Sequence, residues 1–388
     1  MSLQRKKSTP EILLVFLACL LWTVPVFAQR PPKVTFLVPN PQNAQTFWTQ
    51  SVEIMQAVAE DLKIDFTTAY SKPSSYNQKK EGLRILRAQP APDYFLTLYL
   101  LEATGRHLKF AEQSRIHSFI FNAGVVPEDR QDIGRPRQKY RYWIGQLIPD
   151  DRQAGFLLAD KLIDQAKTAG KTATDGKVHV IGLSGFGASV DKFRTDGLAS
   201  RINGQNDALL NQTVLTGWSQ SNAYDATLKA LREFPMTAVI WCVSDTTALA
   251  AVQAAKKLGK TPGKDLFIGG MDWSPPGIKA VASGDMAVTV GGHFLQGAEA
   301  LILVHDHYYG IDFVNDPGID VETPMTAITT VNAAQYLHAL NTIDWHKIDF
   351  RKYSKKYNPA MKHYDFSLDK LLDQQEKQKN PDRDSNSF

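Results

Sequence analysis

The stretch KVTFLV at residues 33–38, followed by FWTQSVEIMQAVAEDL at residues 47–62, decides the fold. The first stretch is an apolar run of strand length. The second carries apolar side chains at Val52, Met55 and Leu62, which is the spacing of an amphipathic helix. A strand followed directly by a helix is half of a βαβ unit, so the chain begins an α/β fold.

The same alternation continues and then restarts, which predicts two lobes. Further strands of a first lobe are expected at 64–70, 94–98, 118–121 and 142–147. After a helical pattern at 154–166, VHVIGL at 178–183 opens a second lobe. Its further strands are expected at 213–216, 238–243, 266–270 and 287–290, and its helices at 222–233 and 246–258. Because a helix (294–309) and a strand (325–331) follow, the chain crosses between lobes more than twice.

The C-terminal residues have a different character. Residues 341–388 are rich in Lys, Asp, Gln and aromatic side chains, with one amphipathic stretch near 368–376. This composition predicts a peripheral wrap that ends in a disordered tail at 377–388.

The first 28 residues are typical of a secretory signal peptide. A cationic start at residues 5–7 precedes an apolar run at 12–22, and Val-Phe-Ala at 26–28 offers a cleavage site. The run is too short to span a bilayer comfortably. We therefore expect a soluble periplasmic protein that begins at Gln29, with a retained membrane anchor or lipidation at Cys19 as alternatives.

Composition excludes several function classes. The 44 basic and 40 acidic residues give a formal net charge of +4, which predicts no nucleic-acid partner. Cys242 is the only cysteine outside the signal peptide, so no intramolecular disulfide can form and a buried inert thiol is expected. Large apolar cores must then stabilise the protein.

Three short motifs imitate enzymes without matching them. GLSGF at 182–186 has phenylalanine where a nucleophile elbow needs glycine. GFGASV at 185–190 lacks the third glycine of a dinucleotide-binding turn. His305 and His307 are two residues apart on a predicted helix and cannot easily share a metal ion, so we interpret this pair with Asp306 as a solvated helix face. We expect no metal, no cofactor and no catalysis.

Residues 222–290 carry a family resemblance in the order of their motifs. The motifs are Tyr224-Asp225, Ser244-Asp245, Ala248-Leu249-Ala250-Ala251, Ile268-Gly269-Gly270-Met271-Asp272, Gly284-Asp285 and Val288-Thr289-Val290. This order resembles the type I periplasmic binding proteins of the ribose- and galactose-binding group. The stretches 47–48, 93–110, 121–122 and 221–225 are most similar to the related periplasmic receptors for autoinducer-2.

The resemblance implies two doubly wound parallel-sheet lobes, joined by a hinge of three crossovers, with a C-terminal extension. In this reading, residues 1–28 are the signal peptide and 334–388 the extension. The N-terminal lobe comprises 33–147 and 293–322, and the C-terminal lobe comprises 148–292 and 323–333.

The family binds its ligand between the carboxyl ends of the strands of both lobes, where open α/β sheets hold ligands. Carried over to this chain, that position implies a ring of ligand-binding residues: Asn43, Gln45, Trp48, Asn122, Arg194, Asn222, Asp245 and Asp272. Aromatic faces would cover a sugar ring, while carboxylates accept from hydroxyl groups and Arg or Asn donate to them. The structural alternatives are Trp48 as core filling, Asn122 as a turn residue, Arg194 as a surface ion-pair partner of Asp196, and Asp245 and Asp272 as helix caps.

The chain departs from the autoinducer-2 receptors at Met271 and Gly292, which stand where those receptors have a cleft tryptophan and an arginine. Trp273 and His293 are each one residue away and compensate in part. We expect a monomeric solute-binding protein that closes on a small sugar-like polyol and delivers it to the permease of an ABC importer. The alternatives are a receptor that presents its ligand to a membrane sensor kinase or a related signalling protein, and a secreted enzyme.

Overall fold

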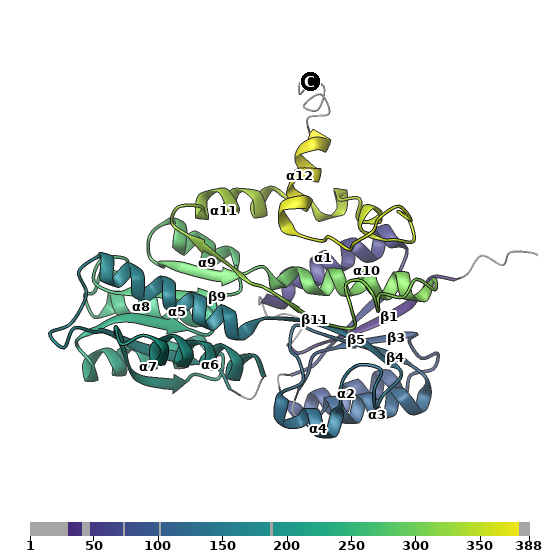
Figure 1. The fold of residues 1–388 in the computed structure, drawn as a ribbon, viewed down its shortest axis with the longest axis horizontal. Coiled ribbons are helices and arrows are strands. Elements are labelled where there is room, and N and C mark those ends of the chain that lie inside the picture. The colour runs from purple at the N-terminus through teal and green to yellow at the C-terminus, as the bar shows by residue number, and fades with distance from the viewer. Residues whose placement is uncertain (1–29, 41–46, 73, 101, 187–188, 380–388) are drawn as a thin grey trace, which may run out of the picture. The chain divides into compact units, whose positions relative to one another are not determined.

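The computed structural model describes residues 30–40, 47–72, 74–100, 102–186 and 189–379. Its strands form two six-stranded sheets with helices packed on them (Figure 1). Every strand pair in the described residues is parallel except β10 with β12. The α/β class with two doubly wound lobes, predicted from the sequence, is confirmed.

The first lobe is built on a sheet with the strand order β11-β5-β4-β3-β1-β2. Its strands are β1 (Lys33–Val38), β2 (Asp65–Tyr70), β3 (Tyr94–Thr97), β4 (His117–Phe121), β5 (Trp143–Pro149) and β11 (Asp320–Thr323). Its helices are α1 (Phe47–Leu62), α2 (Ser75–Leu86), α3 (Thr104–Ser114), η1 (Pro127–Asp129), α4 (Arg130–Ile133) and α10 (Gln296–Tyr308). Strand β11 was not predicted from the sequence.

The second lobe repeats this plan with the strand order β12-β10-β9-β8-β6-β7. Its strands are β6 (Val178–Ser184), β7 (Ala208–Leu215), β8 (Thr237–Cys242), β9 (Phe267–Met271), β10 (Val288–Gly291) and β12 (Thr326–Thr329). Its helices are α5 (Asp151–Thr168), α6 (Ser189–Gly204), α7 (Gln220–Glu233), α8 (Asp245–Lys257) and α9 (Pro275–Ala282).

The apolar patterning explains these elements. All six residues of β8, TAVIWC, are buried, because a central parallel strand is covered on both faces and reads as a continuous apolar run. Cys242 at its end is a buried free cysteine, and burial raises the pKa of its thiol. Helix α1 spans the predicted residues and buries Val52, Met55 and Leu62.

The chain passes between the two sheets three times before its C-terminal residues. The passages lie between β5 and α5, between β10 and α10 through the short helix η2 (His293–Leu295), and between β11 and β12. The loops that follow the strands of both lobes therefore meet near these connections. The residue boundaries of the lobes given from the sequence stay a prediction.

Residues 333–379, named here the C-terminal segment, pack on both lobes. They contain α11 (Ala333–Thr342), η3 (Trp345–Lys347), η4 (Phe350–Tyr353) and α12 (Leu368–Lys379). Helix α11 packs on α9 of the second lobe, and η3 and η4 pack on α1 of the first. Figure 1 shows the segment above these helices. The prediction places the start of the disordered tail at 377, which is too early, because α12 continues to Lys379. Residues 380–388 lie outside the described residues.

The prediction that His305 and Asp306 form a solvated helix face is wrong. Both are fully buried, because the C-terminal segment covers α10. Asp306 accepts hydrogen bonds from Ser354 Oγ, from the Lys355 backbone N–H at 2.6 Å and from Tyr364 Oη at 2.8 Å. A local pattern on α10 cannot reveal a cover that comes from a distant part of the sequence.

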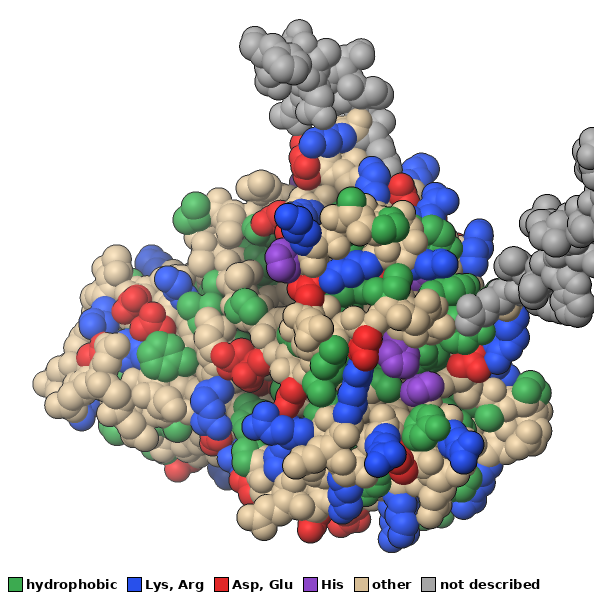
Figure 2. Space-filling model, turned by 45° about the vertical axis from the view of Figure 1, so that its right-hand side comes forward, with side chains coloured by type: hydrophobic (Ala, Val, Ile, Leu, Met, Phe, Trp, Pro, Cys, Tyr) green, Lys and Arg blue, Asp and Glu red, His purple; other side chains and the backbone are tan. Residues whose placement is uncertain are grey.

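The surface carries both signs of charge. Figure 2 shows Lys and Arg side chains interspersed with Asp and Glu on one face, in keeping with the small net charge. Within the described ranges, we find no helix with the length and apolarity needed to cross a membrane.

Candidate functional site

Arg194 of α6 is the centre of a buried polar cluster. Its side chain is 3% exposed, and its Nε donates to Asp151 Oδ1 at 2.8 Å. Its Nη1 donates to the Val243 carbonyl oxygen at 2.8 Å, immediately after β8. Helices α5 and α6 approach closely here, since a side chain at Gly155 would collide with the backbone of Arg194. The guanidinium is therefore held from several sides by the protein itself.

Asp272 and His293 complete the cluster. Arg194 Nη1 also donates to Asp272 Oδ1 at 3.3 Å, and its Nη2 lies 3.2 Å from His293 Nε2. A guanidinium can only donate, so we assign His293 Nε2 as the acceptor and place the ring proton on Nδ1. The 3.6 Å separation between His293 Nε2 and Asp272 Oδ1 is too long for a competing hydrogen bond.

Two donors of this cluster face no acceptor in the described part of the chain. Four of the five N–H groups of Arg194 have partners, which leaves one on Nη2. His293 Nδ1 is buried and has no hydrogen-bond partner among the described residues. Together with the Asp272 carboxylate, these atoms offer a ligand two donors and an acceptor.

The first lobe contributes an aromatic face. The ring of Phe47, at the start of α1, stacks on His293 with 4.7 Å between centroids and an interplanar angle of 19°. Trp48 contacts Phe47, Phe36 and Phe121. An apolar cluster then joins the lobes: Trp48, Leu98 and Ala123 come from the first lobe, and Val190 and Trp218 come from the second.

The charges of the cluster favour a neutral ligand. Burial raises the pKa of Asp151, while Arg194 opposes that rise. Burial by itself would lower the pKa of Arg194, but Asp151 and Asp272 raise it, so the guanidinium stays charged. One cation faces two carboxylates, and an anionic ligand would meet repulsion from Asp272.

Asp245 accepts its hydrogen bonds from Ser274 and Thr289, which lie outside this cluster. Its side chain is fully buried, accepts from the Ser274 backbone N–H at 2.8 Å and accepts from Thr289 Oγ1 at 2.7 Å. Burial, and then the negative charge of Asp272, raise the pKa of Asp245 to about 8. The alternative that Asp245 caps α8 is wrong, since Ser244 is the N-cap in a capping box with Thr247.

The other predicted residues are dispersed. Trp273 is 4% exposed and packs on Tyr336 of the C-terminal segment. Asn222 is exposed, and its amide donates to the Thr216 carbonyl oxygen at 3.0 Å, close to the start of α7. Asn122 is buried after β4 with a left-handed φ of 67°. Asn43 and Gln45 lie outside the described residues.

The structure therefore brings together the predicted residues Arg194, Asp272 and His293. It adds Phe47 and Asp151, and these two were not predicted as site residues. Asp151 lies two residues after the end of β5, and the same rule that pointed to Asp272 after β9 could have found it. Arg194 does not form a surface pair, because Asp196 pairs with Lys192 at 2.9 Å and with Arg152 at 3.1 Å. Asp272 does not cap α9, where Ser274 is the N-cap.

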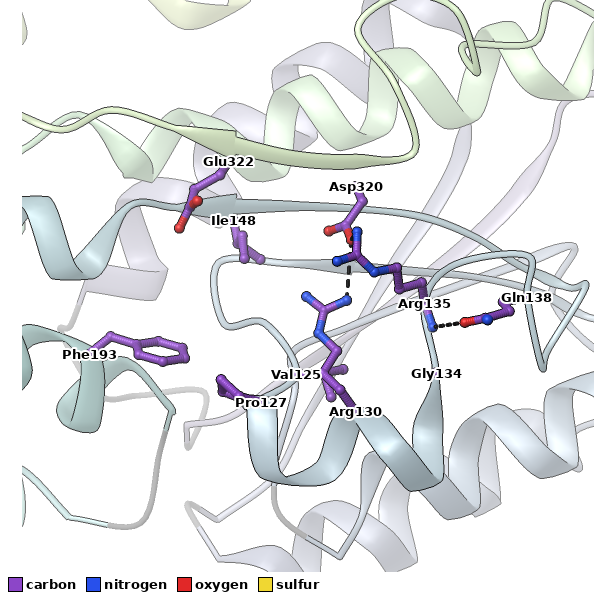
Figure 3. A pocket seen from close by; sticks show the side chains of 10 residues that line it. All are labelled: Val125, Pro127, Arg130, Gly134, Arg135, Gln138, Ile148, Phe193, Asp320 and Glu322. Carbon is purple, nitrogen blue, oxygen red and sulfur yellow. Dashed lines mark hydrogen bonds and ion pairs between the residues drawn. The ribbon is translucent and has the colours of Figure 1, made fainter.

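A cavity of about 530 Å³ is lined by none of the predicted site residues (Figure 3). Its lining is Val125, Pro127, Arg130, Gly134, Arg135, Gln138, Ile148, Phe193, Asp320 and Glu322. Arg130 and Arg135 both pair with Asp320, at 3.2 and 3.5 Å. With Glu322, the lining carries two cationic and two anionic side chains, so its formal charges balance.

Comparisons with known proteins agree with this fold. A family model described as the periplasmic binding protein domain matches residues 142–307. The galactofuranose-binding protein YtfQ of Escherichia coli (strain K12) is 23% identical over 241 residues, covering 61% of this chain and 70% of that protein.

Solved structures extend the likeness over most of the chain. A periplasmic sugar-binding protein from Pseudomonas fluorescens has a TM-score of 0.78 at 28% identity, covering 87% of this chain and 98% of the other. The binding component of an arabinose ABC transporter from Shewanella sp. ANA-3 has a TM-score of 0.67 at 21% identity, covering 80% of this chain and 98% of the other.

The fold, the family model and these neighbours confirm the predicted resemblance to the type I periplasmic binding proteins. The family and the neighbours are solute-binding proteins and not enzymes. The finer likeness of some stretches to the autoinducer-2 receptors stays a prediction.

Proposed function

We propose that this protein binds a small, neutral sugar between its two lobes in the periplasm and delivers it to the permease of an ABC importer. The observation that carries the proposal is the cluster of Arg194, Asp272 and His293 at the carboxyl ends of strands, with Phe47 of the other lobe stacked on it.

The chemistry of the cluster suits a polyol. The Asp272 carboxylate accepts from a hydroxyl group, and the remaining N–H of Arg194 and the Nδ1–H of His293 donate to hydroxyl or ring oxygens. Phe47 and Trp48 offer apolar faces to the C–H face of a sugar ring. A hydrogen bond to a charged group contributes about 1.5–3 kcal/mol, so a few of them with burial reach micromolar affinity, about −8.2 kcal/mol.

Closure of the lobes follows from the same arrangement. A ligand that contacts Phe47 of the first lobe and Asp272 of the second stabilises only the arrangement in which both lobes are close. The three connections near the cluster serve as the hinge. We propose that Trp48 and Asn122 also face the ligand, and that Asp245, Asn222 and Trp273 support the loops around it.

The comparisons support a sugar and an importer. YtfQ is named for galactofuranose, and the Shewanella neighbour is the binding component of an arabinose transporter. The secretory signal expected at residues 1–28 supports a periplasmic location. We propose that the protein acts as a monomer, since each copy holds a complete set of cluster residues.

A thermal-shift screen tests the proposal. D-galactose, L-arabinose, D-allose and D-ribose would be compared with a panel of amino acids. A sugar at about 100 times its Kd should stabilise the folded state by roughly 2.7 kcal/mol and raise the Tm. If amino acids raise the Tm and no sugar does, the proposal is wrong.

A further inference from the structure

Tyr336 of α11 brings the C-terminal segment next to the ligand-binding cluster, because it packs on Trp273. The Tyr336 ring lies 5.1 Å from that of Trp273, at an interplanar angle of 53°. Trp273 follows Asp272 directly in the sequence. A residue that lies outside both sheets therefore touches the neighbour of the carboxylate that we assign to ligand binding.

The backbone at Asp272 and Trp273 needs outside support. Their φ angles of 114° and 54° both lie in the left-handed region, which non-glycine residues rarely adopt. The Asp272 N–H donates to the Val290 carbonyl oxygen at 2.9 Å, and the Trp273 indole N–H donates to the Thr289 carbonyl oxygen at 3.3 Å. One side of the indole packs against Gly291, where a side chain would collide with it, and Tyr336 packs against the indole as well.

Tyr336 belongs to a segment that is fixed to the first lobe. Asp61 of α1 accepts from the backbone N–H groups of Phe350 at 2.7 Å and Arg351 at 3.3 Å. Asp316 accepts from the Tyr364 backbone N–H at 2.9 Å and from Lys355 Nζ at 2.6 Å. With the bonds to the buried Asp306 described above, three carboxylates of the first lobe hold the segment. The segment is therefore a fourth connection between the lobes.

We propose that Tyr336 is a positioning residue for the ligand-binding loop, and that the C-terminal segment acts as a clasp that holds Asp272 and Trp273 in their left-handed conformation. Tyr336 touches no ligand itself. It limits the motion of Trp273, and Trp273 in turn fixes the direction of the Asp272 carboxylate toward Arg194. The importance of this loop for ligand binding rests on the function proposed above, but its positioning does not.

Hydrogen–deuterium exchange of the ligand-free, full-length protein tests the clasp. Two amides report on the loop: that of Asp272, bonded to Val290, and that of Ser274, bonded to Asp245. We expect Tyr336→Ala to speed their exchange by about tenfold, because local opening becomes easier. Amides of the buried strand β8 should exchange as before, which separates this effect from global unfolding. Tyr336→Phe, which keeps the ring, should restore the exchange of the wild type.

A matched control lies in the same segment. Tyr357 stacks on His305 of the first lobe, with 5.4 Å between the ring centroids. Tyr357→Ala should leave the amide exchange of Asp272 and Ser274 unchanged. If Tyr336→Ala does not fold, Tyr336→Leu keeps the apolar volume, removes the ring and should still speed exchange of the loop. Wild-type exchange at both amides in a folded Tyr336→Ala or Tyr336→Leu variant would overturn the proposal.

Sugar titrations separate the clasp from the proposed function. If loop exchange responds to Tyr336 while none of D-galactose, L-arabinose, D-allose and D-ribose binds the wild type, the clasp stands and the sugar function fails. If one of these sugars binds and Asp272→Ala weakens it, while loop exchange ignores Tyr336, the sugar function stands and the clasp is wrong.

Discussion

The two lobes contribute differently to the candidate site. The second lobe supplies a charged network, Arg194 with Asp151 and Asp272, that is hydrogen-bonded within the protein. The first lobe supplies aromatic faces, Phe47 and Trp48, that are only partly buried. In the function proposed above, the second lobe provides the polar contacts to the ligand, and the first lobe covers the ligand during closure.

Arg194→Ala should produce the largest effect, because it removes the centre of the charged network. Asp151 would be left as a buried carboxylate without its partner, which costs about 3–5 kcal/mol of stability. Urea unfolding of the ligand-free protein measures this loss. From the sequence alone, Arg194 could be a ligand contact that contributes little to the stability of the fold. Its burial argues that it does contribute to that stability. A variant that unfolds at the same urea concentration as the wild type would contradict the network described here.

Asp272→Ala should mainly affect binding. Its side chain is 16% exposed, and Arg194 keeps Asp151 as a partner, so the fold should lose little stability. Loss of one charged hydrogen bond should weaken sugar binding by about 1.5–3 kcal/mol, roughly 10- to 150-fold. Calorimetric titration with the tightest-binding sugar of the panel gives the affinity. Unchanged affinity with lowered stability would make Asp272 a structural residue.

Phe47→Ala tests the contribution of the first lobe and should have a smaller effect. The stacked ring contributes about 0.5–1.5 kcal/mol beyond its buried area, so sugar affinity should fall by about two- to thirteenfold. Phe47→Tyr, which keeps the ring, is the matched control for the same titration. If Phe47→Ala weakens binding more than Asp272→Ala does, the division of roles between the lobes is reversed.

Asp196→Ala should have the smallest effect. Asp196 lies on the same helix as Arg194, but its pairs with Lys192 and Arg152 are solvent-exposed. Exposed ion pairs contribute about 0–1 kcal/mol. Urea unfolding and sugar titration of the variant should both resemble those of the wild type. A loss of stability as large as that of Arg194→Ala would mean that burial does not determine how much an ion pair contributes to stability in this protein.

Local patterns were sufficient for most of the fold. Helix α1 and strand β8 could be predicted because their apolar spacing is unbroken. Strand β7 begins at Ala208, earlier than the predicted 213, because most residues of this edge strand are exposed or half-buried and the strand lacks a continuous apolar run.

The site could be predicted only in part. The rule that ligands bind beyond the carboxyl ends of strands pointed to Asp272 and Arg194 but could not decide which carboxylates face the cluster. Asp245 turned inward because Ser274 and Thr289 donate to it. Trp273 is held by a residue of the C-terminal segment, which is remote in sequence. Such contacts depend on tertiary packing, which residue spacing does not encode.

Small-angle X-ray scattering tests the central claim, binding between two lobes that close, most directly. The full-length mature protein would be measured without ligand and then saturated with the sugar that gives the largest Tm increase. The account predicts a smaller radius of gyration in the saturated protein, because contacts to Phe47 and Asp272 draw the lobes together. Identical scattering profiles at saturation would contradict it.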